Sequence, residues 1–132
     1  MAPRDVVERL HAAINAHDPA AGRDLFAPDA RIVAATGRVL TIAGLGQMLT
    51  DTATAFPDLV VRVERWTEQG DTVVTEEIME GTHLGPFAGL SATGRRVQLR
   101  LCHVARVVDD RIVERVAYHD TAGVLRQLTS SP

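Results

Sequence analysis

The sequence predicts an α+β fold in which N-terminal helices pack on one face of a strongly curved, mainly antiparallel sheet. Apolar residues recur at helical spacing in the first half of the 132-residue chain, whereas the second half contains consecutive strand-like segments separated by turn signals. No repeat, linker or low-complexity stretch divides the sequence, so we expect one domain over residues 1–132. A curved sheet covered by helices encloses a pocket, and such pockets are usual sites for small molecules.

Two helices are predicted near the N-terminus. Pro3 suits a first helical turn, and apolar residues follow at helical spacing as far as Ile14. Asp18 is a favoured N-cap and Pro19 a favoured first helical residue. This pair therefore predicts the start of a second, short helix that ends near Phe26.

A short strand and a third helix are predicted next. Residues 31–35 are expected to form the strand, and Thr41 is placed to cap a helix that ends at Phe56. Gly44 and Gly46 each weaken such a helix by about 1 kcal/mol relative to alanine. We therefore expect the first turn to be the weakest part of this helix.

The rest of the chain is predicted to be a meander of four strands that ends in a helix over residues 121–128. The strands are expected over residues 59–66, 72–80, 96–108 and 111–120. A loop rich in Gly, Pro, Ser and Thr joins the second of these strands to the third. Alternation along the third strand places Leu99, Leu101, His103 and Ala105 on one, mostly apolar, face.

Composition and motifs narrow the partners. The formal net charge of −3 arises from mixed signs without a basic block, so no nucleic-acid partner is expected. No segment has the length and apolarity of a membrane span, and the single cysteine, Cys102, excludes an internal disulfide and fits a cytoplasmic protein. The five histidines match no metal-ligand spacing, and no glycine motif suits a nucleotide. We therefore expect neither a metal nor a cofactor.

Asp120 is the first candidate for acid/base chemistry. It follows an apolar strand, where a poorly hydrated carboxyl group gains proton affinity and can serve as an acid or base. Aspartate is also a favoured N-cap, so the alternative interpretation is that Asp120 only begins the last helix. The two roles are compatible with each other.

His103 is the second candidate. Its neighbours on the same face of the strand are apolar, so its imidazole is predicted to point into the interior. There it is either a proton shuttle or a core histidine that is satisfied by a hydrogen bond. By the same alternation Glu77 shares a face with Val73 and Met79, which adds a second carboxylate to the pocket unless a β-bulge reverses the assignment.

Five further residues are candidates for contact with a substrate. Tyr118 belongs to the last strand and is placed to assist the acid/base groups. His83 follows a strand at the expected mouth of the pocket, where a plain loop histidine is the alternative. Phe56, Trp66 and Phe87 either line the cavity or fill the core.

Several motifs, in the same order along nearly the whole chain, resemble those of the SnoaL-like polyketide cyclases. They are Phe56-Pro57-Asp58-Leu59, Gly81-Thr82-His83-Leu84-Gly85-Pro86-Phe87, Thr93-Gly94-Arg95-Arg96-Val97, Arg111-Ile112-Val113-Glu114-Arg115, Asp120 and Leu125-Arg126-Gln127-Leu128. The resemblance implies an NTF2-like cone and a cofactor-free intramolecular aldol condensation, with Asp120 as the acid/base and His103 as its helper. The chain departs from the family at Val116, where many members carry tryptophan, and aromatic residues make up only 4% of it.

Two functions are compatible with these observations. The first is a cofactor-independent acid/base enzyme that cyclises, isomerises or hydrates a small hydrophobic ketone. The second is a non-catalytic protein that binds a small molecule or serves as a dimeric scaffold. In either case the outer face of the sheet carries Cys102, Val104 and Val108 among polar residues, and this mixed surface suits a homodimer formed sheet to sheet.

Overall fold

The computed structural model describes residues 1–130, which form helices and a six-stranded sheet. The helices are α1 (Pro3–Asn15), α2 (Pro19–Arg23), α3 (Ile42–Ala55) and α4 (Thr121–Thr129). The strands are β1 (Phe26–Val33), β2 (Val39–Leu40), β3 (Val60–Gln69), β4 (Thr72–Thr82), β5 (Arg96–Val108) and β6 (Arg111–His119). Their order in the sheet is β2-β1-β6-β5-β4-β3; β1 and β6 pair in parallel, and the other neighbours pair antiparallel.

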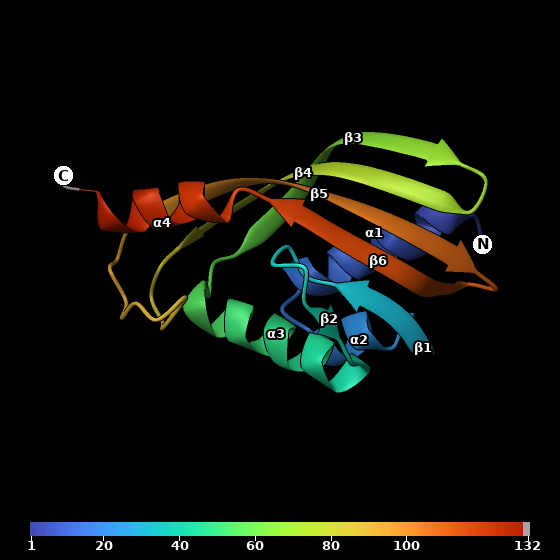
Figure 1. The fold of residues 1–132 in the computed structure, drawn as a ribbon, viewed down its shortest axis with the longest axis horizontal. Helices are drawn as coiled ribbons and strands as arrows, with labels where there is room; N and C mark the ends of the chain where they lie inside the picture. Colours follow the sequence, from blue (N-terminus) through green and yellow to red (C-terminus); the bar gives the residue numbers. More distant parts are fainter. Residues whose placement is uncertain (131–132) are drawn as a thin grey trace.

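The sheet curves over the first three helices, which lie on the same side of it (Figure 1). Helix α4 lies at the end of the sheet away from the N-terminus (Figure 1). It is held there by Gln127, whose side-chain amide donates to the Gln98 carbonyl and accepts from the Gln98 backbone N–H, each at 2.9 Å. The predicted α+β fold, with helices on one face of a curved and mainly antiparallel sheet, is confirmed. Among residues 1–130, no helix has both the length and the apolar character that crossing a membrane requires.

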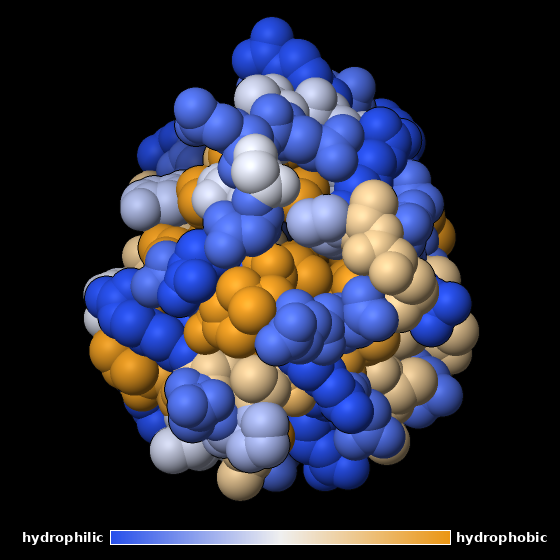
Figure 2. All heavy atoms as spheres, turned by 90° about the vertical axis from the view of Figure 1, so that its right-hand side faces the viewer, coloured by the Kyte–Doolittle hydropathy of each residue, from blue (hydrophilic) through white to orange (hydrophobic). Residues whose placement is uncertain are grey.

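The main core lies between α1 and the concave face of the sheet. Val6, Val7 and Leu10 on α1 are at most 3% exposed and belong to the same apolar cluster as Val73 and Ile112. Burial of such a side chain contributes about 1.5–3 kcal/mol. A second cluster at the α4 end contains Ala55, Phe56, Leu59, Val97, Leu99, Val124 and Leu128. Figure 2 views the opposite end, where α1 begins, and shows apolar side chains framed by a hydrophilic surface.

The structure differs from the prediction around β1. Helix α2 ends at Arg23, and β1 already begins at Phe26, ahead of the predicted strand over residues 31–35. Phe26 is 4% exposed and pairs with Ile112 of β6, so its burial in the sheet overrides the local helix signal. The two-residue strand β2 was not predicted, because it exists only through its pairing with β1.

The remaining elements follow the prediction closely. Thr41 caps α3 by accepting a 3.0 Å hydrogen bond from the backbone N–H of Gly44, and the first turn forms despite its glycines. Burial of Leu45 to 1% exposure supports that turn. Strand β5 has the predicted bounds and alternation, which places His103 on the concave face and Cys102 on the other.

Candidate active site

A mostly apolar cavity of about 220 Å³ lies between α1, α3 and the concave face of the sheet. Its polar wall is formed by the side chains of Glu77, His103, Arg115 and His119, together with His17 and Asp18 from the loop that begins α2. The apolar wall includes Ile14, Met48, Leu49, Leu59, Val61, Met79, Phe87, Leu99 and Leu101. We call this space the inner cavity.

Glu77 is the centre of the polar wall. Its side chain is 1% exposed and accepts a hydrogen bond from the Thr75 hydroxyl at 2.8 Å. His103 Nδ1 lies 2.5 Å from its Oε2, and His11 Nε2 lies 2.7 Å from its Oε1. Burial alone would raise the pKa of Glu77, but the hydrogen bonds from His103 and His11 outweigh it, so this pKa is lowered. A buried carboxylate is thereby kept ionised by three donors.

His103 is held in one orientation and one tautomer. Its Nδ1 faces the Glu77 carboxylate and therefore carries the proton, which leaves a free lone pair on Nε2. Nε2 makes no hydrogen bond within residues 1–130, and the side chain lines the inner cavity. Burial, followed by the charge of Arg115, lowers the pKa of His103 to about 4, although Glu77 acts in the opposite direction. At neutral pH the ring is consequently a base that is ready to accept a proton.

His11 contacts the same carboxylate from α1. Its Nδ1 lies 3.0 Å from the carbonyl oxygen of Val7, so both of its ring nitrogens face acceptors. Trp66 covers the outer edge of His11 with ring centroids 6.0 Å apart, and the Arg4 guanidinium covers Trp66 in turn.

Arg115 and His119 complete the polar wall from β6. They share a strand face, because alternate residues of β6 point to the same side of the sheet. Arg115 is 6% exposed, and burial lowers the pKa of its guanidinium. His119 is exposed at the edge of the cavity, and its partial desolvation, followed by the charge of Arg115, lowers its pKa.

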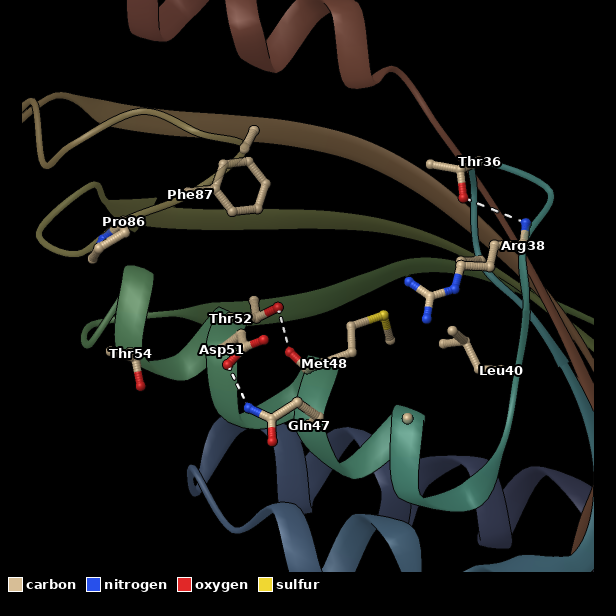
Figure 3. Close-up of a pocket in the computed structure, with 13 residues that line it drawn as sticks. Thr36, Arg38, Leu40, Gln47, Met48, Asp51, Thr52, Thr54, Pro86 and Phe87 are labelled. Carbon is tan, nitrogen blue, oxygen red and sulfur yellow. Dashed lines mark hydrogen bonds between the residues drawn. The ribbon is translucent and has the colours of Figure 1, made fainter.

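A second cavity of about 660 Å³ adjoins the first (Figure 3). It lies between α3, the turn before β2 and the loop after β4, and we call it the outer cavity. Met48, Thr52 and Phe87 belong to the walls of both cavities. In Figure 3 the Met48 side chain extends from α3 into the space below the sheet, and Phe87 lies above Thr52. Ligand sites usually measure about 300–1,000 Å³, so the inner cavity alone is small for a ligand larger than a small ring system.

The structure brings His103 and Glu77 together, but it places Asp120 elsewhere. The Asp120 carboxylate accepts a 2.8 Å hydrogen bond from the backbone N–H of Gly123 and caps α4. Its side chain is 62% exposed, lies 3.6 Å from the Arg126 guanidinium and is not part of the wall of the inner cavity. The expectation of a poorly hydrated carboxyl group is thus not met, whereas the predicted helix cap is confirmed.

The residues proposed for substrate contact are dispersed. Tyr118 is 59% exposed and borders a surface hollow with Cys102 on the outer side of the sheet, away from the inner cavity. His83 is fully buried, lies 2.9 Å from the Thr93 hydroxyl through Nδ1 and packs near Phe56. Phe56 and Trp66 do not line the inner cavity; Phe87 does.

Sequence reasoning missed three polar residues around Glu77 and His103, namely His11, Arg115 and His119. His11 lies on the apolar face of α1 with Val7, at the helical spacing of four, and its contact with Glu77 spans 66 positions of the chain. Arg115 and His119 share the inward parity of β6, which the sequence pattern contained. Within residues 1–130, no group of three or more His, Cys, Asp or Glu side chains is arranged to hold a metal ion.

Comparison with known proteins gives a consistent result. The family model for SnoaL-like polyketide cyclases matches residues 4–128. The aklanonic acid methyl ester cyclase DnrD of Streptomyces peucetius is 35% identical over 63 residues, which are 48% of this chain and 43% of DnrD. This match therefore spans less than half the length of that relative.

Solved structures extend the likeness over nearly the whole chain. IdmH of Streptomyces antibioticus, a proposed polyketide cyclase, is 32% identical, with a TM-score of 0.84 over 96% of this chain and 97% of IdmH. AclR of Streptomyces galilaeus, a proposed hydroxylase, is 25% identical, with a TM-score of 0.89 over 98% of this chain and 97% of AclR. A further likeness, to a protein with a ketosteroid isomerase-like fold from Catenulispora acidiphila, has a TM-score of 0.81 and agrees with the predicted NTF2-like cone.

Proposed function

Because the chain belongs to the SnoaL-like polyketide cyclase family, we propose that it is a cofactor-independent acid/base enzyme. The proposed reaction is an intramolecular aldol cyclisation of a polyketide, or a related isomerisation or hydration of a small hydrophobic ketone. The single observation that carries the proposal is the contact of His103 Nδ1 with Glu77 Oε2, because it leaves an unprotonated Nε2 beside an apolar cavity.

In the proposed mechanism His103 Nε2 removes a proton from a carbon next to a ketone. The resulting enolate carbon attacks a second carbonyl of the same molecule and forms the new carbon–carbon bond. The imidazolium then returns its proton to the alkoxide, so no atom enters or leaves. Glu77 stabilises the imidazolium during the step, and acid/base catalysis of this kind contributes about 10²–10⁴-fold in rate.

The low pKa of His103 restricts the carbon acids that the enzyme can use. A ring with a pKa of about 4 is a weak base, so it matches a carbon that is acidified by two neighbouring carbonyl groups rather than by one. Polyketides contain such carbons between alternate carbonyls. The apolar walls of the inner cavity lower the local polarity and thereby strengthen the electrostatic effect of the polar groups.

The test uses aklanonic acid methyl ester, the compound named for the relative DnrD, as the first substrate. Ring closure by aldol addition gives a product of unchanged mass with a new chromatographic retention time. We expect wild-type protein to accelerate its formation and His103→Ala to abolish the acceleration. Cys102→Ala is the matched control, because Cys102 adjoins His103 on the other face of β5.

A parallel assay follows hydrogen–deuterium exchange at the acidic carbon of 2-acetylcyclohexanone by NMR. It reports proton removal even when the natural substrate differs from aklanonic acid methyl ester. If wild-type protein binds both compounds but accelerates neither reaction, the protein is a non-catalytic binder and the enzyme proposal fails.

We also keep the homodimer as a proposal. Tyr118 and Val108 are exposed hydrophobic residues of β6 and β5, at 59% and 38%, and Tyr118 adjoins Cys102 on the outer face. Light scattering of the purified protein tests the proposal, and a monomeric mass would contradict it.

A further inference from the structure

Arg115 is a buried cation with no acceptor of its own. It is 6% exposed and lines the inner cavity, yet within residues 1–130 its guanidinium takes part in no hydrogen bond or ion pair. A guanidinium has five N–H donors. Among the described residues, the one side-chain nitrogen or oxygen that is fully enclosed and lacks a hydrogen bond belongs to His83, so the unpaired donors of Arg115 are open to the cavity. In folded proteins, an arginine that is buried to this degree usually has a carboxylate or carbonyl partner.

Glu77 does not fill that role. Arg115 and Glu77 attract each other through space, but the two oxygens of Glu77 already accept hydrogen bonds from Thr75, His103 and His11. His103 and His119 are the other titratable groups near the guanidinium, and its charge lowers the pKa of both. The donors of Arg115 are therefore available to a molecule that enters the inner cavity.

The rest of the cavity wall defines the body of that molecule. Leu99 and Leu101 of β5, Met79 of β4 and Leu49 of α3 present apolar side chains to the same space. A ligand that satisfies both parts of the wall has an apolar body and one strongly accepting group. The planar fork of a guanidinium matches two oxygens side by side better than a single oxygen.

We propose that Arg115 anchors a ligand that carries two neighbouring oxygens sharing one negative charge on an apolar body. A carboxylate and the enolate of a 1,3-dicarbonyl both have this chemistry. The proposal rests on the proposed function, because it places the ligand in the cavity where His103 would act. In that reaction the guanidinium would bind the enolate oxygens that form when the proton leaves carbon.

The test measures binding rather than turnover. The first probe pair is 2-naphthoate and its methyl ester; the second is 2-acetylcyclohexane-1,3-dione, which is an anion at neutral pH, and 2-acetylcyclohexanone, which is neutral. Dissociation constants are measured by calorimetry for wild type, Arg115→Met and Arg115→Lys. Arg100→Met is the matched control, because it removes one exposed positive charge from the same sheet outside the inner cavity.

We expect wild type to bind at least one anionic probe about 10- to 100-fold more tightly than its neutral partner, as a charged hydrogen-bonded pair predicts. Arg115→Met should abolish that preference without weakening the binding of the neutral probes. Arg115→Lys should keep part of the preference, and Arg100→Met should keep all of it. The probe pair that shows the preference distinguishes a carboxylate ligand from an enolate ligand.

Two results would overturn the anchor: no preference for either anion in wild type, or a preference that survives in Arg115→Met. The comparison within wild type needs no variant, so it decides the question even if Arg115→Met does not fold. Anion preference without ring closure would refute only the proposed function. Ring closure without anion preference would refute only the anchor.

Discussion

His103 Nδ1 lies 2.5 Å from Glu77 Oε2, between two adjacent strands of the sheet and below the surface of the protein. This contact combines two effects that oppose each other. The carboxylate fixes the tautomer of the ring and stabilises its protonated form, whereas burial and the charge of Arg115 favour the neutral form. The neutral form prevails, so the ring is a base with a defined direction.

Glu77→Gln should greatly reduce the proposed activity. The amide oxygen can still accept from His103 Nδ1–H, but it lacks the negative charge that stabilises the imidazolium, so kcat should fall about 10²–10⁴-fold. The rate of ring closure or of carbon–hydrogen exchange measures the effect. Glu76→Gln is the control, because Glu76 is the adjacent residue on the outer face and pairs with Arg65. Equal losses in both variants would show that the defect is structural.

The pH profile should carry the signature of His103. With a pKa of about 4, the ring stays unprotonated at neutral pH, so kcat/KM should be constant from about pH 7 down to about pH 5 and fall below that. An ordinary histidine would give a fall near its usual pKa of about 6.5. A nitrogen-15 NMR titration of the imidazole checks the assignment. A midpoint near 6.5 in both measurements would contradict this account of the site.

Stability should decrease as the pH falls from about 6.5 to about 4, so the loss begins at a higher pH than the loss of activity. The unfolded chain binds a proton at His103 with the usual pKa of about 6.5, whereas the folded protein does so only at about 4. Between these values the unfolded state binds more protons, so the free energy of unfolding should decline as the pH falls through this window. The lowered pKa of Glu77 adds a further loss as the pH falls below its usual 4.5. Urea titrations of wild type and His103→Leu should differ in this slope.

Asp120→Ala separates the helix cap from catalysis. The variant loses the hydrogen bond to Gly123 N–H, so unfolding free energy should drop by about 1 kcal/mol. The rate should stay within about twofold of wild type, because the exposed carboxylate is not part of the inner cavity. Asp120→Asn should retain most of the cap. A hundredfold loss of rate in both variants would instead assign the base to Asp120, as the family resemblance implies.

The sequence predicted side-chain positions correctly where the alternation within a single strand determines which face a side chain occupies. Alternation along β5 and β4 correctly placed His103 and Glu77 inside, because the side-chain period of a strand is two. The sequence was ambiguous where one local pattern fits two roles. An aspartate between an apolar strand and a helix can be a buried acid or a helix cap, and the two have the same sequence pattern. Only the exposure of the Asp120 side chain in the structure distinguishes them. His11 was missed because its partner lies 66 residues away.

Met48→Trp tests whether the inner and outer cavities form one binding site. Met48 lies on the wall of both, so a larger side chain there should narrow their junction. KM for aklanonic acid methyl ester, which exceeds the inner cavity, should rise about tenfold or more, whereas 2-acetylcyclohexanone should exchange at an unchanged rate. Thr50→Trp is the control, because Thr50 is exposed on the same helix and lines neither cavity. An equal loss of rate for both compounds would mean that the variant disturbs the inner cavity itself. If neither the KM of aklanonic acid methyl ester nor the exchange rate of 2-acetylcyclohexanone changes, the junction at Met48 is not part of the substrate site.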